Sequence, residues 1–362
     1  MLAAWRESSH PLTEWVIEPI VTAWCREPGA GTRSDGPVYR LLGQRAKGTS
    51  VSGGVAQRVD AAADVEIRLH PIPSPDAKPY IIVVGPDGRL WFCESGTGKI
   101  GRLDPNTGEF AEFPTPTPNS RPIGIIPGAD GNLWFCENAA NQIGRITPQG
   151  VISEFPLPTP GAGPDGIMCG PDGNLWFSEA PISRIGRITP RCEVTEFSRG
   201  LTPGCRPLSI VVRDGALWFS EYEAGQIGRI TVAGEVTEYP VPTPNSEPRA
   251  MVTHPDGNIW FVQTKANGLG RIDRAGRVTE FPVATPNASL RGVTVAPDGD
   301  LWFTENFANK IGRMAPDGRV LGEYAIPGEN CGARAIIAAP DGRLFFSAHD
   351  AGAIGEVVVR RR

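Results

Sequence analysis

Short apolar runs, separated by Gly, Pro, Asp and Asn, follow one another in a repeated order along most of this chain. The central phrase of the repeat is clearest as DGNLWFSE at residues 172–179. An I-G-R-I-like run follows each copy, and an acidic-aromatic run with a Pro-rich connection comes next. Further copies occupy residues 87–94, 130–137, 214–221, 256–263, 298–305 and 341–348. Self-similarity at a spacing of about 42 residues indicates a repeat architecture.

Each repeat contains four short apolar runs bounded by turn residues, which predicts four antiparallel strands. The Asp-Gly pair between the first two runs favours a tight hairpin, because such a turn needs a positive backbone φ. Four antiparallel strands per repeat are typical of a β-propeller blade, whose faces are covered by the neighbouring blades. The Trp-Phe pair of the central phrase would supply the aromatic area between blades.

The two ends of the repeated region predict how the ring closes. The last repeat stops at residues 353–359, AIGEVVV, one strand short of a full blade, and residues 64–73, DVEIRLHPIP, have the form of the missing strand. We therefore predict an all-β, seven-bladed β-propeller of four-stranded antiparallel blades over residues 64–362, closed by this N-terminal strand so that no edge stays open. Residues 1–63 carry no trace of the repeat and are predicted to be a flexible N-terminal extension.

Composition and charge exclude several function classes. Lys and Arg number 35 against 40 Asp and Glu, and the resulting net charge of −5 gives no sign of nucleic-acid or anionic membrane binding. No apolar run approaches the roughly 20 residues that span a bilayer, and no secretory signal is recognisable at the N-terminus. We expect a cytoplasmic monomer. Cys192 and Cys205 flank one predicted strand, and the sequence leaves open whether they form a disulfide.

Carboxylates recur where the second strand of a blade ends, beside the central channel. Hairpin pairing in blade 3 sets Asp165 opposite Glu179, and two close carboxylates either share a proton or hold a cation. Asp165 and Glu179 are therefore the candidate metal ligands. A second interpretation stays open, in which these glutamates cap strand ends and pair with Arg121 or Arg206. The equivalent positions are Glu94, Glu137, Glu179, Glu221 and Glu305.

Three arginines occupy equivalent first-strand positions on successive blades, which predicts an anion site at the channel mouth. They are Arg249, Arg291 and Arg334, and the pairing sets Glu305 opposite Arg291. Planar guanidinium groups bind carboxylate or phosphate in a bidentate way. The candidate ligand-binding residues are therefore these three arginines with Glu305. In the alternative interpretation, Glu247 and Glu305 neutralise the arginines in a solvated ion-pair rim.

The unit R-P-x-G-I, D-G-N-L-W-F-x-E, I-G-R-I, E-F-P-x-P-T-P resembles that of the streptogramin B lyases, also called virginiamycin B lyases, over about residues 64–362. The resemblance implies a seven-bladed propeller that opens the lactone of a cyclic depsipeptide antibiotic by elimination, without water. It also implies a histidine base, a magnesium ion held by two glutamates, and a second histidine that contacts the substrate.

The family's working residues are replaced in this sequence at every matching position. The base falls on Arg334, the substrate histidine on Arg291, and the two metal glutamates on Gly332 and Ala348. Arginine cannot act as a base near neutral pH, because its pKa exceeds about 12. Glycine and alanine offer no carboxylate, so magnesium is suggested by resemblance while its expected ligands are absent.

Two functions of different classes remain open at this point. The first is a lyase-like propeller without the family's catalytic residues, which binds a small or peptide-like anionic ligand at the channel mouth. The second is an active carbon-oxygen lyase with rearranged residues, in which His349 works with Glu305. The arginines of the I-G-R-I runs recur in six of seven repeats, so we expect them to be architectural.

Overall fold

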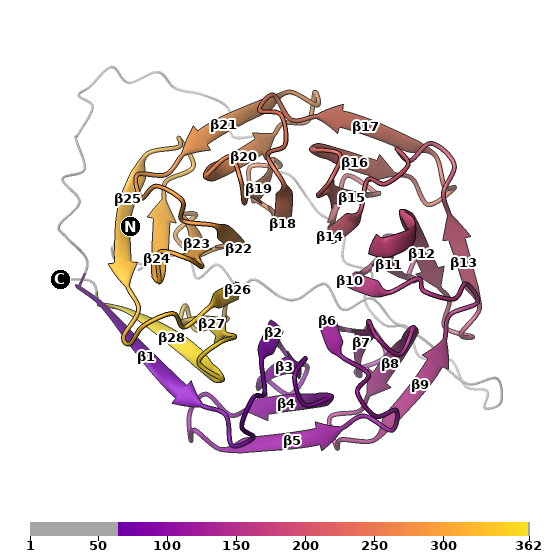
Figure 1. Cartoon of the computed structure of the whole chain (residues 1–362), viewed down its shortest axis with the longest axis horizontal. Coiled ribbons are helices and arrows are strands. Elements are labelled where there is room, and N and C mark those ends of the chain that lie inside the picture. Colours follow the sequence, from indigo (N-terminus) through magenta and orange to yellow (C-terminus); the bar gives the residue numbers. More distant parts are fainter. Residues whose placement is uncertain (1–63, 361–362) are drawn as a thin grey trace, which may run out of the picture.

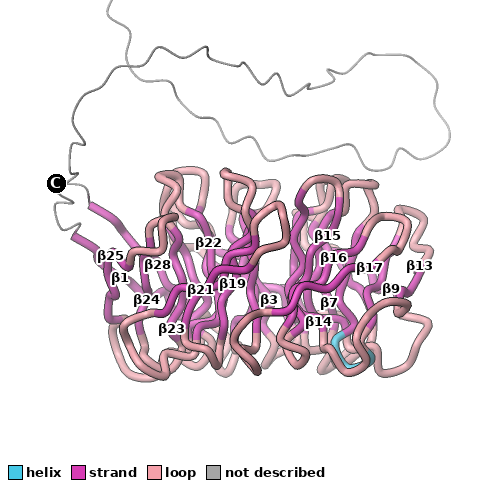
Figure 2. Tube along the Cα trace, turned by 90° about the horizontal axis from the view of Figure 1, so that it is seen from above, coloured by secondary structure: helices cyan, strands magenta, loops and turns pink. Residues whose placement is uncertain are grey.

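Seven four-stranded antiparallel sheets stand as blades around a central channel (Figure 1). This computed structural model describes residues 64–360, so the extension predicted for residues 1–63 lies outside the described residues. Seen from the side, the blades form a flat disc with loops along both faces (Figure 2). The predicted seven-bladed β-propeller is confirmed.

The first three blades each take four consecutive strands. Blade 1 comprises β2 (Pro79–Val84), β3 (Leu90–Glu94), β4 (Lys99–Leu103) and β5 (Phe110–Pro114). Blade 2 comprises β6 (Pro122–Pro127), β7 (Leu133–Glu137), β8 (Gln142–Ile146) and β9 (Ile152–Pro156). Blade 3 comprises β10 (Pro164–Cys169), β11 (Leu175–Glu179), the 3-10 turn η1 (Ala180–Ile182), β12 (Arg184–Ile188) and β13 (Val194–Phe197). No helix in the described part of the chain has the length and apolar character needed to cross a membrane.

The next three blades repeat this order, and the last one differs. Blade 4 comprises β14 (Pro207–Arg213), β15 (Ala216–Glu221), β16 (Gln226–Ile230) and β17 (Val236–Pro240). Blade 5 comprises β18 (Pro248–Thr253), β19 (Ile259–Gln263), β20 (Gly268–Ile272) and β21 (Val278–Pro282). Blade 6 comprises β22 (Leu290–Val295), β23 (Leu301–Glu305), β24 (Lys310–Met314) and β25 (Val320–Ala325). Blade 7 comprises β26 (Ala333–Ala338), β27 (Leu344–Ala348), β28 (Ala353–Arg360) and β1 (Asp64–Pro71).

The N-terminal strand closes the ring. β1 pairs with β28 in an unbroken antiparallel register from Asp64 opposite Arg360 to Pro71 opposite Ala353. The pairing covers the edge that β28 would otherwise leave open. Blade 7 is also joined to blade 1, because Ser347 Oγ of blade 7 donates a hydrogen bond of 2.6 Å to the Tyr80 carbonyl of blade 1.

Stacked aromatic rings fill the space within and between blades. The second-strand Trp stacks on the outer-strand aromatic residue of its own blade; in blade 1, Trp91 lies 5.5 Å from Phe113 between ring centroids. The Arg102 guanidinium lies 5.3 Å from the Trp91 centroid. The following Phe is fully buried, and Gly101 is required beside it because a Cβ there would overlap the Phe92 ring. The same Arg–Trp contact is formed by Arg102, Arg145, Arg187, Arg229, Arg271 and Arg313. These arginines are architectural, as expected.

A buried hydroxyl group joins several blades to the next one. In blade 3, Ser178 Oγ accepts a hydrogen bond of 2.9 Å from the Gly166 N–H and donates one of 2.7 Å to the Leu208 carbonyl. In blade 6, Thr304 Oγ1 does the same, and its 2.7 Å bond fixes the carbonyl of Arg334 on blade 7. Residues at the channel mouth are therefore positioned by the neighbouring blade.

Pairs of carboxyl groups, an inner one that is buried and an outer one that is half-buried, link the second strand of five blades to the outer strand. In blade 4, both oxygens of the fully buried Glu221 find no donor among the described residues, and Glu238 lies beside it. Two carboxyl groups can hydrogen-bond only if one of them carries a proton. Blade 5 has Gln263 here, and its Nε2 donates a 2.6 Å hydrogen bond to Glu280 Oε1. The pairs are Glu94–Glu112, Glu137–Glu154, Glu179–Glu196, Glu221–Glu238 and Glu305–Glu323.

The outer glutamates also connect neighbouring blades through the Pro-rich connections. Glu154 of blade 2 accepts hydrogen bonds of 2.8 Å from both the backbone N–H and the hydroxyl of Thr117, which follows blade 1. Glu238 of blade 4 binds Thr202 in the same way. When the inner glutamate of a pair is protonated, it is therefore the donor and the outer glutamate is the acceptor. Burial raises the pKa of the inner five, to between about 7 and about 9.

Removal of the closing strand should destabilise the whole ring. A chain that begins at Ser74 lacks β1, which exposes the edge of β28 and the apolar side chains that β1 covers. We expect it to aggregate, or to melt at least about 5 °C below a chain that begins at Asp64. Differential scanning calorimetry of the two proteins checks this, and equal melting temperatures would contradict the closing role of β1.

Glu221→Gln should remove a pH-dependent loss of stability. Burial, with repulsion from Glu238, raises the pKa of Glu221 from 4.5 to about 9. A raised folded-state pKa gives stability that is full below about pH 4.5 and is lost as the pH rises toward 9. Gln keeps the donor at every pH, so the variant should gain on the order of 5 kcal/mol over the wild type between pH 5 and pH 9, at about 1.4 kcal/mol for each pH unit. Urea unfolding of both proteins at pH 5 and at pH 9 measures this difference in the free energy of unfolding.

The exposed Glu235 provides the matched control, because Glu235→Gln makes the same change of charge outside the buried pair. We expect its free energy of unfolding to follow that of the wild type at both pH values. A stability difference between Glu221→Gln and the wild type that does not vary with pH would show that Glu221 carries no proton in the folded state.

Candidate ligand site at the channel mouth

A β-bulge near the start of every first strand decides which residues reach the channel. In blade 3, Pro164 pairs with Glu179 and Ile167 with Phe177, so the first strand holds one residue more than its partner. The predicted pairing of Asp165 with Glu179 is therefore wrong by one residue. In blade 6, likewise, Glu305 lies opposite Leu290, not Arg291. The pairing predicted from the sequence assumes a regular antiparallel ladder, whereas the bulge adds one residue to the first strand.

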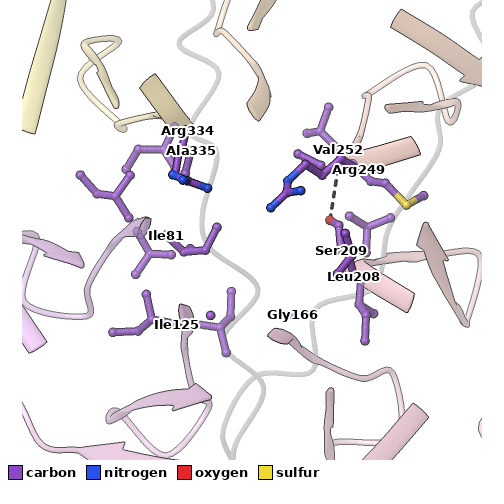
Figure 3. A pocket seen from close by; sticks show the side chains of 18 of the residues that line it. Ile81, Ile125, Gly166, Leu208, Ser209, Arg249, Val252, Arg334 and Ala335 are labelled. Carbon is purple, nitrogen blue, oxygen red and sulfur yellow. Dashed lines mark hydrogen bonds between the residues drawn. The ribbon is translucent and has the colours of Figure 1, made fainter. Parts of the chain in front are cut away.

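The first-strand residue that follows each of these pairs lies at the channel mouth. We call the seven equivalent residues the mouth ring: Tyr80, Ile123, Asp165, Leu208, Arg249, Arg291 and Arg334. All except Ile123 line one cavity of about 300 Å³ inside the channel. Arg249 and Arg334 point toward each other across this cavity (Figure 3). The three predicted arginines are thus brought together, on blades 5 to 7.

Arg249 reaches across the channel to the first blade. Its Nη2 donates a 2.7 Å hydrogen bond to Tyr80 Oη, and its guanidinium lies 5.7 Å from the Tyr222 ring centroid. The Arg334 guanidinium lies 4.9 Å from the centroid of the same Tyr80 ring. Although burial lowers it, the neighbouring Tyr80 and Asp165 hold the pKa of Arg249 above its usual value. Tyr80 and Tyr222 were not predicted as site residues, and only the closed ring brings them to the arginines.

Arg291 and Arg334 have few polar partners. The Nε atom of each is buried and finds no hydrogen-bond partner among residues 64–360. Burial, followed by repulsion from the other arginines, lowers the pKa of Arg291. Burial is also the first cause of the lowered pKa of Arg334, to which Arg249 adds. Both side chains nevertheless stay charged, because an arginine pKa lies far above neutral.

The acidic residues near the arginines do not pair with them. Glu247 forms an ion pair of 2.8 Å with Lys265 and accepts a 2.6 Å hydrogen bond from the Tyr222 hydroxyl. Glu305 is fully buried in blade 6 beside Glu323 and is not among the residues that line the cavity. No carboxylate of the described chain lies within ion-pair distance of any of the three arginines. Glu247 and Glu305 therefore do not neutralise the three arginines, and the alternative of a solvated ion-pair rim is wrong.

Asp165 and Glu179 lie in different environments. Asp165 lines the cavity, where burial raises its pKa while the charges of Arg249, Arg206, Arg121 and Arg334 act against that rise. Glu179 is buried within blade 3, beside Glu196 and Arg184. Among the described residues, no group of three or more His, Cys, Asp or Glu side chains is arranged to hold a metal ion. The mouth therefore contains three guanidinium groups and one carboxyl group.

The inner glutamates at the ends of the second strands are not paired with Arg121 or Arg206 either. Arg121 Nη1 donates to Asn138 Oδ1 at 3.5 Å, and Arg206 forms a 3.0 Å ion pair with the exposed Glu223. The possible disulfide to Cys192 is not formed, because Cys205 is a free buried thiol. Burial raises the pKa of Cys205 to about 12, which makes it unreactive near neutral pH.

His349 stands at the rim of the mouth with a partner that the sequence did not indicate. Its Nδ1 lies 2.8 Å from Asp350 Oδ1, and its ring meets Tyr80 edge-on at a centroid distance of 6.1 Å. The Asp350 carboxylate occupies the space that a side chain on Gly332 would fill. Burial and then the charge of Arg334 lower the pKa of His349. Glu305, the partner considered above, belongs to the interior of blade 6.

Comparisons with known proteins agree with the fold and with the repeat. The model of the virginiamycin B lyase family matches residues 56–253 and, in an overlapping match, residues 166–362. Virginiamycin B lyase of Saccharopolyspora erythraea is 54% identical over 41 residues, which span 11% of this chain and 14% of that protein.

Solved structures extend the likeness over the whole propeller. A streptogramin B lyase structure superposes with a TM-score of 0.78 at 35% identity, covering 82% of this chain and 98% of that one. A catalytically inactive variant of Staphylococcus aureus virginiamycin B lyase, solved with quinupristin, gives a TM-score of 0.78 at 36% identity and covers 82% and 100%. By its repeat, its fold and these matches, this chain belongs to the virginiamycin B lyase family.

Proposed function

We propose that this propeller binds a small anionic ligand at the channel mouth, with its anionic group on Arg249, Arg291 and Arg334. The observation that carries the proposal is the charge of the mouth. Three guanidinium groups line one cavity with a single carboxyl group, Asp165, and no carboxylate of residues 64–360 forms an ion pair with them. The three arginines are partly buried, where charge without a partner is costly, and an anion from outside would supply the partner.

Guanidinium nitrogens without a hydrogen-bond partner support a carboxylate or phosphate as the bound group. Arg249 uses one nitrogen, Nη2, for its hydrogen bond to Tyr80. The Nε atoms of Arg291 and Arg334 are buried and have no hydrogen-bond partner among the described residues. Planar donors of this kind bind two oxygens of one anion at once. Each charge-assisted hydrogen bond in such a site contributes roughly 1.5–3 kcal/mol.

The residues present do not fit the magnesium ion that the family resemblance implies. At the two positions that match the family's metal glutamates stand Gly332 and Ala348, which have no carboxylate. The carboxylate of Asp350 lies against Gly332 but is engaged by His349 and faces Lys78 at 3.7 Å. We therefore propose an anion site that works without the metal.

A lyase with rearranged residues is the second candidate, and the His349–Asp350 pair favours it. A histidine whose pKa is lowered is neutral near pH 7 and can accept a proton, and a carboxylate on Nδ1 leaves Nε2 as the accepting atom. In this candidate His349 takes a proton from the carbon next to the one that bears the ester oxygen, a C=C bond forms as the alkyl C–O bond breaks, and Arg334 stabilises the carboxylate that leaves. The anion-binding proposal needs only the arginines and ranks first.

Arg334→Ala should weaken the binding of butanoate, a short carboxylate probe, at least about tenfold. The melting temperature should stay the same or rise slightly, because the change also removes repulsion among the partly buried arginines. Isothermal titration calorimetry measures the affinity. Arg277→Ala is the matched control, since it removes the same charge from an exposed side chain paired with Asp273. Equal affinities of the two variants would contradict the proposal.

The purified protein should not linearise a streptogramin B antibiotic in a magnesium-dependent way. Loss of a positioned base alone costs about 10²–10⁴ in rate, and the metal ligands are replaced as well. Mass spectrometry of the antibiotic, with and without magnesium, checks this. Magnesium-dependent turnover at an ordinary enzyme rate would contradict it. Turnover without magnesium that disappears in His349→Gln would instead establish the second candidate.

A further inference from the structure

The channel wall changes from charged to apolar below the mouth ring. Three residues further along each first strand stands another set of equivalent residues, which we call the apolar ring: Val83, Ile126, Met168, Val211, Val252, Thr294 and Ile337. All seven line the same cavity as the arginines. Six are hydrocarbon or thioether side chains, and none is charged. A single cavity therefore has a cationic end and an apolar end.

The two ends are separated by a distance that suits a short chain. Three residues of extended strand rise about 10 Å, and the cavity of about 300 Å³ is at the small end of the range for ligand pockets. Figure 3 shows Ile81 and Val252 beside the same space into which Arg249 and Arg334 point. The hydrogen bond between Arg249 and Tyr80 spans the mouth from blade 5 to blade 1. This leaves passage for a narrow group rather than for a folded peptide.

We propose that the ligand is an unbranched, medium-chain aliphatic carboxylate. Its carboxylate lies between Arg291 and Arg334, and its hydrocarbon chain runs down the channel to the apolar ring. This inference rests on the proposed function, which requires only the anionic end. It adds the chemical class of the ligand and assigns the apolar ring as the part of the site that selects chain length.

Apolar and anionic parts are both needed to satisfy this cavity. A free inorganic anion would neutralise the arginines and leave the apolar ring facing water. A neutral hydrocarbon would cover the apolar ring and leave three guanidinium groups without an anion, at a large cost in free energy. An amphipathic carboxylate satisfies both ends, because each methylene it buries removes apolar surface from water.

The test is a series of straight-chain carboxylates: butanoate, hexanoate and octanoate. Calorimetric titration of the full chain should give an affinity that rises about fourfold with each added methylene. Arg334→Ala should weaken all three by the same factor and leave this dependence on chain length intact. A steep slope that survives the loss of the head-group arginine is the expected result.

Two substitutions in the apolar ring change polarity with little change of shape. Val252→Thr places a hydroxyl in the wall, and Thr294→Val removes the one hydroxyl that the ring has. We expect Val252→Thr to weaken octanoate several-fold and Thr294→Val to strengthen it, with butanoate nearly unaffected in both. Melting temperatures close to that of the wild type would show that both variants fold. Because the two changes act in opposite directions, general destabilisation cannot imitate them.

The outcomes separate this inference from the proposed function. Butanoate and octanoate binding with equal affinity, weakened by Arg334→Ala, would leave the anion site standing and overturn the medium-chain ligand. Octanoate affinity unchanged by both apolar-ring substitutions would also overturn it. No binding of any carboxylate would overturn the proposed function itself.

Discussion

Burial of each second strand between two neighbouring blades is the constraint on which the rest of this structure depends. Its Trp and Phe side chains are almost fully buried, and a single four-stranded sheet cannot cover both of its own faces. Only the closed ring does so, which is why β1 must return to β28. Hydroxyl groups such as those of Ser178 and Thr304 then fix the channel side of one blade to the next. Stability and the position of the mouth have the same origin.

The first strand is the part of the blade that this constraint leaves free to vary. It lies at the channel, and its bulge places one residue per blade at the mouth. At that position the repeat breaks down into Tyr, Ile, Asp, Leu and three Arg, whereas the second strands stay nearly identical. A repeat protein can change what it binds at such positions without losing its fold. The family match therefore reflects the shared scaffold, and the residues of the mouth ring determine which ligand can bind.

Two sets of ionisable groups, the buried inner glutamates and the partly buried mouth arginines, respond differently to burial. Burial shifts the inner glutamates toward their neutral form, since it raises their pKa into the range from about 7 to about 9, and the protonated form donates a hydrogen bond to the outer glutamate. Gln263 does the same with an amide. The mouth arginines Arg249, Arg291 and Arg334 cannot become neutral in this way, because an arginine stays charged at any physiological pH. The inner glutamates are consequently satisfied within their blades, whereas the three arginines line the channel cavity without an ion-pair partner among the described residues.

The sequence by itself determined the number of blades, their strands, the closing strand and the gathering of three arginines on blades 5 to 7. All of these follow from a repeat whose turns and apolar runs are local. The tertiary structure alone decided what those residues meet. One extra residue per first strand moved Glu179 and Glu305 away from Asp165 and Arg291. Ring closure brought Arg249 to Tyr80, 169 residues away in sequence, and Gly332 made room for Asp350 beside His349. Register and side-chain direction depend on bulges and on packing between blades, which no local pattern encodes.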